Sequence, residues 1–165
     1  MREGALVTYR TVVPAEWVDY NGHLNIGCYM IAFDRASDGL ALALGLGEDY
    51  LRRSGNSYYI VEAHLSFMHE VLGGKPIRIA SRLIDADDKR VHFFHEMFEE
   101  EVGFLAATAE MLGLHIDLGR RRAAPFPPPE ARAIAALLEQ HRRLPRPAQL
   151  GRAVALRKRP PAEAI

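Results

Sequence analysis

Apolar residues recur with helical spacing over one long stretch near the start of the chain. Positions 26, 29, 30, 33, 37, 40 and 44 follow the i, i+3, i+4, i+7 pattern; all of these are apolar except Ser37, and most positions between them are also apolar. Asn25 suits the N-cap of such a helix, and Gly45 and Gly47 suit its end. A helix that is apolar on nearly every side must be buried. The pattern therefore predicts a buried helix of about 20 residues.

The rest of the pattern predicts strands around this helix. Short polar links separate the last four apolar runs, and short links favour antiparallel neighbours. The run 104–117 has little polar content and is expected in the centre of the sheet, whereas 51–56 is polar and turn-like. One strongly curved sheet wrapped around the helix would bury it on most sides, which makes the fold class α+β. The expected strands are 5–13, 57–71, 77–84, 91–99 and 104–117.

After the last strand the pattern changes twice. Residues 120–129 form a basic, proline-rich linker, and 129–143 predict a short helix with proline near its first turn. We therefore assign residues 1–143 to one domain that ends in this helix. Residues 144–165 are assigned to a basic, proline-containing tail.

The predicted helix is too long to be covered by one chain. At the usual rise per residue it extends about 30 Å, and one five-stranded sheet cannot cover both of its own faces and both sides of the helix. An uncovered apolar surface of this kind predicts self-association. We expect a homodimer or a homotetramer.

Composition narrows the class of protein. The 165 residues are 48% hydrophobic and 25% charged, as in ordinary globular proteins. The sequence contains no run of 18 apolar residues, so no membrane span is predicted. The N-terminus lacks the apolar segment of a signal peptide. Cys28 is the only cysteine, so no internal disulfide can form. These features predict a cytoplasmic protein that does not bind a membrane.

Charge is distributed unevenly although it balances over the whole chain. Residues 142–165 contain seven basic residues and one acid, Glu163. No aromatic residue lies between these charges, so the tail does not predict nucleic-acid binding. A solvated tail that contacts the acidic body is the simpler interpretation.

A dense polar cluster immediately precedes the predicted helix. Asp19, Asn21, His23 and Asn25 lie within seven residues, Asp19-Tyr20-Asn21-Gly22-His23-Leu24-Asn25. The N-terminal end of a helix has free backbone N–H groups and a partial positive charge. An oxygen that becomes negatively charged is stabilised there. The cluster therefore predicts a reactive site at the start of the helix.

The cluster and the order of elements resemble a known superfamily. Over about residues 5–118 the chain resembles the hotdog-fold acyl thioesterases of the 4-hydroxybenzoyl-CoA thioesterase type, and the cluster is similar to their D-x-N-x-H-x-N motif. Residues 17–25, together with Phe93-Phe94-His95-Glu96-Met97 and Ala123-Ala124-Pro125-Phe126-Pro127, are most similar to betainyl-CoA thioesterases. The resemblance implies a hotdog fold, an acyl-CoA substrate, hydrolysis to free acid and CoA, and no cofactor.

Thioester hydrolysis assigns roles to the cluster. It needs a base or nucleophile, a positioned water and a site for the oxyanion. Asp19 can act as base or nucleophile, and Asn21 and His23 can orient water or polarise the carbonyl. The backbone N–H groups of Gly27 and Cys28 can hold the oxyanion.

Several alternatives to these roles stay open. The 4-hydroxybenzoyl-CoA type has its acid two places later, where this chain has Asn21, so the helix residues Asp34 and Asp38 are further candidates. Asp19 and Asn21 could instead form an Asx-turn that shapes the loop. Gly27 is either a tolerated helix glycine or a point where another backbone approaches closely.

Substrate contacts and other functions are less strongly indicated. Asn25 and the aromatic residues Trp17, Tyr29 and Tyr59 are candidates for substrate binding, and aromatic faces would suit the quaternary ammonium of a betaine. Tyr20, Tyr58 and Phe67 could supply such faces as well. The scattered histidines lack the spacing of a metal site, so no metal is expected. The competing functions are a hotdog enoyl-CoA hydratase and a non-catalytic acyl-CoA-binding module.

Overall fold

A computed structural model of the chain describes residues 5–156. The strands are β1 (Leu6–Val12), β2 (Asn56–Phe67), β3 (Pro76–Ala86), β4 (Arg90–Glu99), β5 (Leu105–Asp117) and the short β6 (Arg122–Ala123). The helices are η1 (Ala15–Trp17), α1 (Ile26–Ala43), α2 (Glu48–Ser54) and α3 (Pro128–His141). The five predicted strands, the long helix and the C-terminal helix are confirmed.

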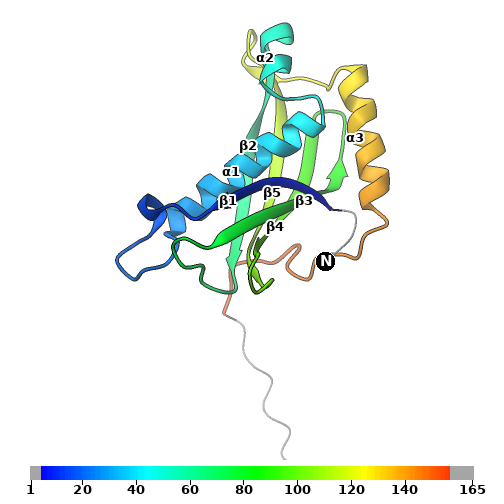
Figure 1. Cartoon of the computed structure of the whole chain (residues 1–165). Helices are drawn as coiled ribbons and strands as arrows, with labels where there is room; N and C mark the ends of the chain where they lie inside the picture. The colour runs from blue at the N-terminus through cyan, green and yellow to red at the C-terminus, as the bar shows by residue number, and fades with distance from the viewer. Residues whose placement is uncertain (1–4, 157–165) are drawn as a thin grey trace, which may run out of the picture.

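The strands form one antiparallel sheet in the order β1-β3-β4-β5-β2, and β6 pairs with β5. β5 lies between β4 and β2, in the interior of the sheet as predicted. β1 and β2 precede and follow α1 in the chain but lie at opposite edges of the sheet. α1 therefore crosses the concave face, and the sheet curls around it (Figure 1). This is the predicted hotdog arrangement, with the two-residue β6 added in the linker.

A chain of hydrogen-bonded side chains, buried except for the half-buried Thr8, ties α1 to three strands. The Ser81 hydroxyl lies 2.5 Å from the Thr8 hydroxyl and 2.6 Å from His95 Nδ1, and His95 Nε2 lies 3.0 Å from Ser37 Oγ. Ser37 donates to the Phe33 carbonyl at 2.9 Å, so His95 donates from Nε2 and accepts at Nδ1. Burial lowers the pKa of His95 to about 3, which keeps the ring neutral. The histidine of the Phe93–Met97 motif thus joins β1, β3 and β4 to the helix.

A glycine allows β1 to pass close to α1, but it is Gly39 and not Gly27. A Cβ atom on Gly39 would lie 2.2 Å from the carbonyl oxygen of Thr8. A Cβ atom on Gly27 would meet only Oδ1 of Asn25, at 3.3 Å. The open question about Gly27 is therefore answered by the position of β1, which crosses α1 nearer its C-terminal end.

The turn expected at 51–56 is instead the end of a helix, α2. Its acids Glu48 and Asp49 lie in the first turn and Arg52 pairs with both, while Gly55 ends it with a φ of +68°. Such charges stabilise a short helix that has little apolar surface. Only Tyr50 is buried, and its hydroxyl lies 2.7 Å from His115 Nε2. The prediction failed because it relied on apolar spacing.

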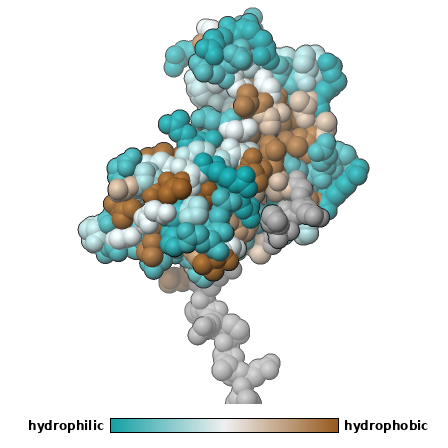
Figure 2. All heavy atoms as spheres, viewed as in Figure 1, coloured by the Kyte–Doolittle hydropathy of each residue, from teal (hydrophilic) through white to brown (hydrophobic). Residues whose placement is uncertain are grey.

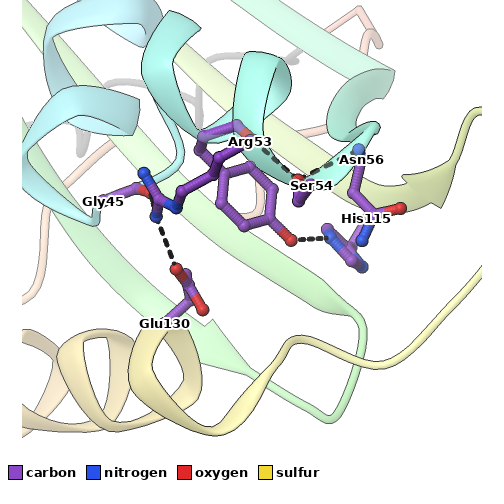
Figure 3. Close-up of polar contacts among 7 residues, drawn as sticks. Gly45, Arg53, Ser54, Asn56, His115 and Glu130 are labelled. Atoms are coloured by element: carbon purple, nitrogen blue, oxygen red, sulfur yellow. Dashed lines mark hydrogen bonds and ion pairs between the residues drawn. The ribbon is translucent and has the colours of Figure 1, made fainter.

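α2 is also held to α3 by an ion pair. Arg53 reaches from α2 to Glu130 in the first turn of α3, with 2.8 Å between Nη2 and Oε1 (Figure 3). Arg53 also donates to the Gly45 carbonyl at 3.3 Å, so one side chain joins the end of the α1 segment, α2 and α3.

α3 covers the edge of β3 where β1 ends. The pairing of β1 with β3 extends only to Ser81, and beyond it the Leu83 N–H donates to His141 Nδ1 at 2.9 Å. Covering an exposed strand edge in this way prevents its pairing with another chain.

The chain after α3 lies against the sheet. Arg82 donates to the Pro145 carbonyl at 2.7 Å, and the Gly151 N–H donates to Glu110 at 2.6 Å. The tail therefore contacts an acid of the body through the backbone N–H of Gly151 and not through a basic side chain. Its basic residues Arg157, Lys158 and Arg159 lie outside the described residues.

One side of α1 and one edge of the sheet stay uncovered. Ile26 and Leu42 of α1 are 69% and 73% exposed, although the pattern predicted burial on nearly every side. The sheet of one chain covers only the inward face of the helix. β2 pairs only with β5, and its residues 59–63 are all exposed. Figure 2 shows apolar patches among the hydrophilic residues on one face of the molecule. No helix within the described range is long and apolar enough to cross a membrane.

Candidate active site

The polar cluster folds into a tight loop that leads into α1. The Asp19 N–H donates to the His23 carbonyl, and the Gly22 N–H donates to the Asp19 carbonyl, both at 3.0 Å. Gly22 has a φ of +85°, a conformation that glycine adopts without strain. The Asn25 N–H closes the loop on the Trp17 carbonyl at 2.8 Å. The loop brings the side chains four residues apart, Asp19 and His23, to one side.

Asp19 both shapes the loop and faces the histidine. Its Oδ1 accepts the Asn21 N–H at 2.8 Å, which is the Asx-turn considered as an alternative. Its Oδ2 lies 3.6 Å from His23 Nδ1. One carboxylate oxygen is therefore fixed by the backbone, and the other is directed toward the imidazole. A structural role for Asp19 does not exclude a chemical one.

Asn25 caps α1 as predicted. Its Oδ1 accepts the Gly27 N–H at 2.8 Å, and its carbonyl accepts the Cys28 N–H at 2.9 Å. Both amides proposed for the oxyanion are thus bonded to Asn25 in this structure. An oxyanion can use them only if Asn25 releases them.

The loop is docked on the segment that follows β2. The Leu24 N–H donates to the Val71 carbonyl at 2.7 Å, and His23 and Leu72 form a further bridge. This contact places Glu70 beside the histidine, with 4.0 Å between Glu70 Oε2 and His23 Nε2. His23 therefore lies between two carboxylates, one from its own loop and one from the segment that follows β2.

A cleft of about 330 Å³ opens at this point. Ligand sites for small molecules usually measure about 300–1,000 Å³, so the cleft suits a small group. Its lining comes from the loop, the first turn of α1 and the end of β2. The lining residues are Asp19, His23, Leu24, Asn25, Ile26, Tyr29, Phe67, Met68, His69 and Glu70.

The structure brings together some of the predicted site residues and not others. Four of them line the cleft: Asp19, His23, Asn25 and Tyr29. Asn21 reaches Asp19 through its backbone only, at the tip of the loop. Trp17 is half-buried and packs against the core, and Tyr59 is exposed on β2. The cleft lining does not include Asn21, Trp17, Tyr59, Gly27, Cys28, Asp34 or Asp38.

Glu70, His69 and Phe67 enter the cleft although no motif marks them as site residues. Tyr29 and Phe67 pack edge to face, with ring centroids 5.0 Å apart. Burial raises the pKa of the Tyr29 hydroxyl, a hydrogen bond with the Val71 backbone opposes this, and the charge of Glu70 adds to the rise. The negative charge of Glu70 is therefore felt inside the cleft.

Two further hollows lie elsewhere on the protein. One of about 370 Å³ adjoins the cleft and shares His69 and Glu70 with it. Another, of about 490 Å³, lies over Glu110 of β5. The next residue on β5, Met111, contacts Ser37 of α1, and successive side chains of a strand point to opposite faces, so Glu110 points away from α1. In that hollow His92 pairs with Glu110 at 2.9 Å and Arg90 pairs with Asp87. This hollow does not include any residue of the loop before α1.

The described residues support neither of two alternatives to the cleft, a metal site and the Ser37–His95 pair. Within residues 5–156, no three His, Cys, Asp or Glu side chains are grouped as ligands for a metal ion. The pair of Ser37 and His95 has the atoms of a hydrolase dyad, but both residues are buried in the core. A substrate cannot reach them.

A family model described as the thioesterase-like superfamily matches residues 13–141. The chain belongs to the thioesterase-like superfamily. The match contains the loop, α1 and all of the cleft, so the membership applies to the part of the chain that carries the site. The predictions of a hotdog fold and of an enzyme that hydrolyses thioesters are confirmed.

Two relatives of this thioesterase are similar over nearly the whole of this chain. The betainyl-CoA thioesterase of Pseudomonas aeruginosa is 39% identical over 151 residues, 92% of this chain and 95% of that protein. An L-carnitine dehydrogenase/betainyl-CoA thioesterase of Rhizobium meliloti is 34% identical over 92% of this chain, which corresponds to 30% of that longer protein.

Solved structures agree with this relationship. A Staphylococcus aureus protein in complex with CoA has a TM-score of 0.86 at 25% identity, over 93% of this chain and 97% of that one.

Proposed function

We propose that this thioesterase hydrolyses betainyl-CoA to free betaine and CoA. Support comes from the 39% identity to the betainyl-CoA thioesterase of Pseudomonas aeruginosa, which extends over 92% of the chain. The cleft of about 330 Å³ at the head of α1 suits a small acyl group. The observation that carries the proposal is the pairing of Asp19 with His23 in this cleft, at 3.6 Å.

In the proposed reaction, Asp19 acts through its Oδ2 atom. This oxygen either takes a proton from a water that attacks the thioester carbonyl or attacks the carbonyl itself. The Asn21 N–H holds Oδ1, so the carboxylate keeps one orientation throughout. His23 lies next to Oδ2 and is proposed to orient the water or polarise the carbonyl. Asn21 contributes through its backbone rather than its side chain.

The oxyanion needs donors at the start of α1. The N–H groups of Gly27 and Cys28 remain our proposal, on the condition that Asn25 releases them when substrate binds. The side chain of Asn25 offers another pair of donors for the oxyanion. Its Oδ1 accepts the Gly27 N–H, and its Nδ2 carries the two hydrogens that would donate. Asn25→Asp keeps the cap and removes these donors, so it distinguishes the two arrangements. A loss of one oxyanion donor typically lowers kcat by about 100- to 1,000-fold.

The enzyme is proposed to be a homodimer or a homotetramer in the cytoplasm. The unpaired edge of β2 and the exposed apolar residues of α1 are the surfaces that a second copy would cover. A reducing compartment suits a chain whose single cysteine can form no internal disulfide.

The function is tested by thiol release from a panel of acyl-CoAs. The panel contains betainyl-CoA, acetyl-CoA, a medium-chain acyl-CoA, an aromatic acyl-CoA and an enoyl-CoA. We expect thiol release with the highest kcat/KM on betainyl-CoA. Binding without thiol release would indicate an acyl-CoA-binding module, and loss of enoyl absorbance would indicate a hydratase; either result contradicts the proposal.

Oxygen-18 separates the two roles of Asp19. In a single turnover in labelled water, direct attack forms an anhydride between Asp19 and the acyl group, and water that opens it at the Asp19 carbonyl leaves the label in that carboxylate. A water route breaks no bond of Asp19 and places the label only in the released acid.

A further inference from the structure

The cleft has an unusual charge for a site that binds part of a CoA ester. Two carboxylates line it, Asp19 and Glu70, and among the residues that the structure describes no lysine or arginine lines it. An acyl group with its own negative charge would be repelled there, and a neutral one would gain nothing from the charge. A cationic acyl group would be attracted by both carboxylates.

The two carboxylates are not equivalent. Asp19 is committed to the Asn21 N–H and to His23, as the proposed reaction requires. Glu70 lies at the outer side of the imidazole, 4.0 Å from Nε2, and its side chain is 68% exposed. This distance is longer than a hydrogen bond, so His23 does not hold Glu70 in place. Glu70 is therefore the carboxylate that can turn toward a ligand.

Aromatic surface lies in the same cleft. Tyr29 is buried and packs edge to face on Phe67, which is itself 46% exposed. Phe67 therefore presents ring surface to the cleft. Aromatic faces attract alkylammonium cations, and the attraction grows when the cation is removed from water. A carboxylate beside an aromatic ring is the combination that suits a quaternary ammonium, which has no hydrogen to donate.

We infer that Glu70 and Phe67 select the acyl group by binding its quaternary ammonium, while Asp19 and His23 serve the thioester carbonyl. This inference rests on the proposed function and adds specificity residues to it. Neither residue belongs to the D-x-N-x-H-x-N motif. Phe67 is the last residue of β2 and Glu70 lies in the segment that follows it, which the Leu24–Val71 hydrogen bond joins to the loop.

The test uses two substrates of the same shape. Betainyl-CoA and 3,3-dimethylbutyryl-CoA differ in one atom, a positive nitrogen in place of a neutral carbon, so the ratio of their kcat/KM values measures recognition of the charge. We expect the wild type to favour betainyl-CoA. Glu70→Gln removes one of the two carboxylates that attract the cation and should lower the ratio about tenfold, which corresponds to about 1.4 kcal/mol.

Two further variants make the result specific. Phe67→Leu keeps apolar contact and removes the ring, so it should also lower the ratio, by about threefold. Glu139→Gln is the matched control, because Glu139 is an equally exposed carboxylate, 63%, on α3 and far from the cleft in sequence. It should leave the ratio unchanged, although it changes the net charge by the same amount.

The outcomes separate this inference from the proposed function. An unchanged ratio in Glu70→Gln, with betainyl-CoA still hydrolysed, overturns only the role of Glu70. An equal fall on both substrates also overturns it, because Glu70 would then act on the shared reaction through His23. A wild type that hydrolyses 3,3-dimethylbutyryl-CoA and not betainyl-CoA overturns both the inference and the proposed substrate.

Discussion

Replacing Gly39 by alanine should destabilise the protein, although alanine is the better helix former. The added Cβ atom would lie 2.2 Å from the Thr8 carbonyl oxygen, and ordinary contact begins at 3.4 Å. β1 or α1 would therefore have to move by about 1 Å. β1 is held by its pairing with β3 and by the Thr8–Ser81–His95–Ser37 chain of hydrogen bonds, so neither element moves freely.

The expected magnitude follows from two opposing effects. Overpacking of this kind costs about 3 kcal/mol at the upper end of its usual range, and the helix propensity of alanine returns about 1 kcal/mol. We expect the free energy of unfolding to fall by about 2 kcal/mol. For a chain of this size that lowers Tm by about 4–8 °C.

The assay is denaturant unfolding with a thermal scan, at one protomer concentration because self-association changes apparent stability. Gly27→Ala is the control, since its new methyl group meets only the Oδ1 atom of Asn25, at 3.3 Å, rather than the backbone of a strand. That variant should lose less stability than Gly39→Ala, because the cap side chain has to shift by only a few tenths of an ångström. If Gly39→Ala were as stable as the wild type, β1 would not pass α1 as closely as the structure shows.

Three further predictions concern pH, assembly and capping. The pKa of His95 is about 3 in the folded chain and about 6.5 in the unfolded chain, so between these values only the unfolded chain takes up a proton. The free energy of unfolding should therefore fall by up to about 1.4 kcal/mol per pH unit as the pH drops from 6.5 to 5, as measured by denaturant titration. Val61→Lys, on the unpaired edge of β2, should reduce the mass measured by light scattering toward the 18.5 kDa of one chain, and an unchanged mass would place the interface elsewhere. Asn25→Ala should cost about 1 kcal/mol of stability through loss of the cap, and Asn25→Ser, which can still cap, should cost less in the same unfolding measurement.

The elements that bury an apolar face could be predicted from spacing alone. α1 and the long strands carry enough apolar residues to reveal their period, and Asn25 identifies the start of α1. α2 carries one buried residue, Tyr50, and is held by charges and by Arg53, so no apolar period reveals it. The sequence does not show whether Gly27 or Gly39 lies where β1 crosses α1. Both are glycines of the same helix, and only the path of β1 distinguishes them.

The site divides in the same way. Asp19 and His23 are close in the chain, and a tight turn at Gly22 is enough to bring them together. Phe67, His69 and Glu70 follow more than 40 residues later, and their place in the cleft depends on the docking of Leu24 on Val71. That contact is set by how the loop meets the end of β2, which no local pattern encodes.

The most direct test of the account compares Asp19→Asn with the wild type in thiol release from betainyl-CoA. Asparagine can still accept the Asn21 N–H through its Oδ1, so the loop should keep its shape while the base or nucleophile is lost. We predict a fall in kcat of about 100- to 10,000-fold with an unchanged melting temperature. Activity near that of the wild type would contradict the account and move the chemistry away from the head of α1.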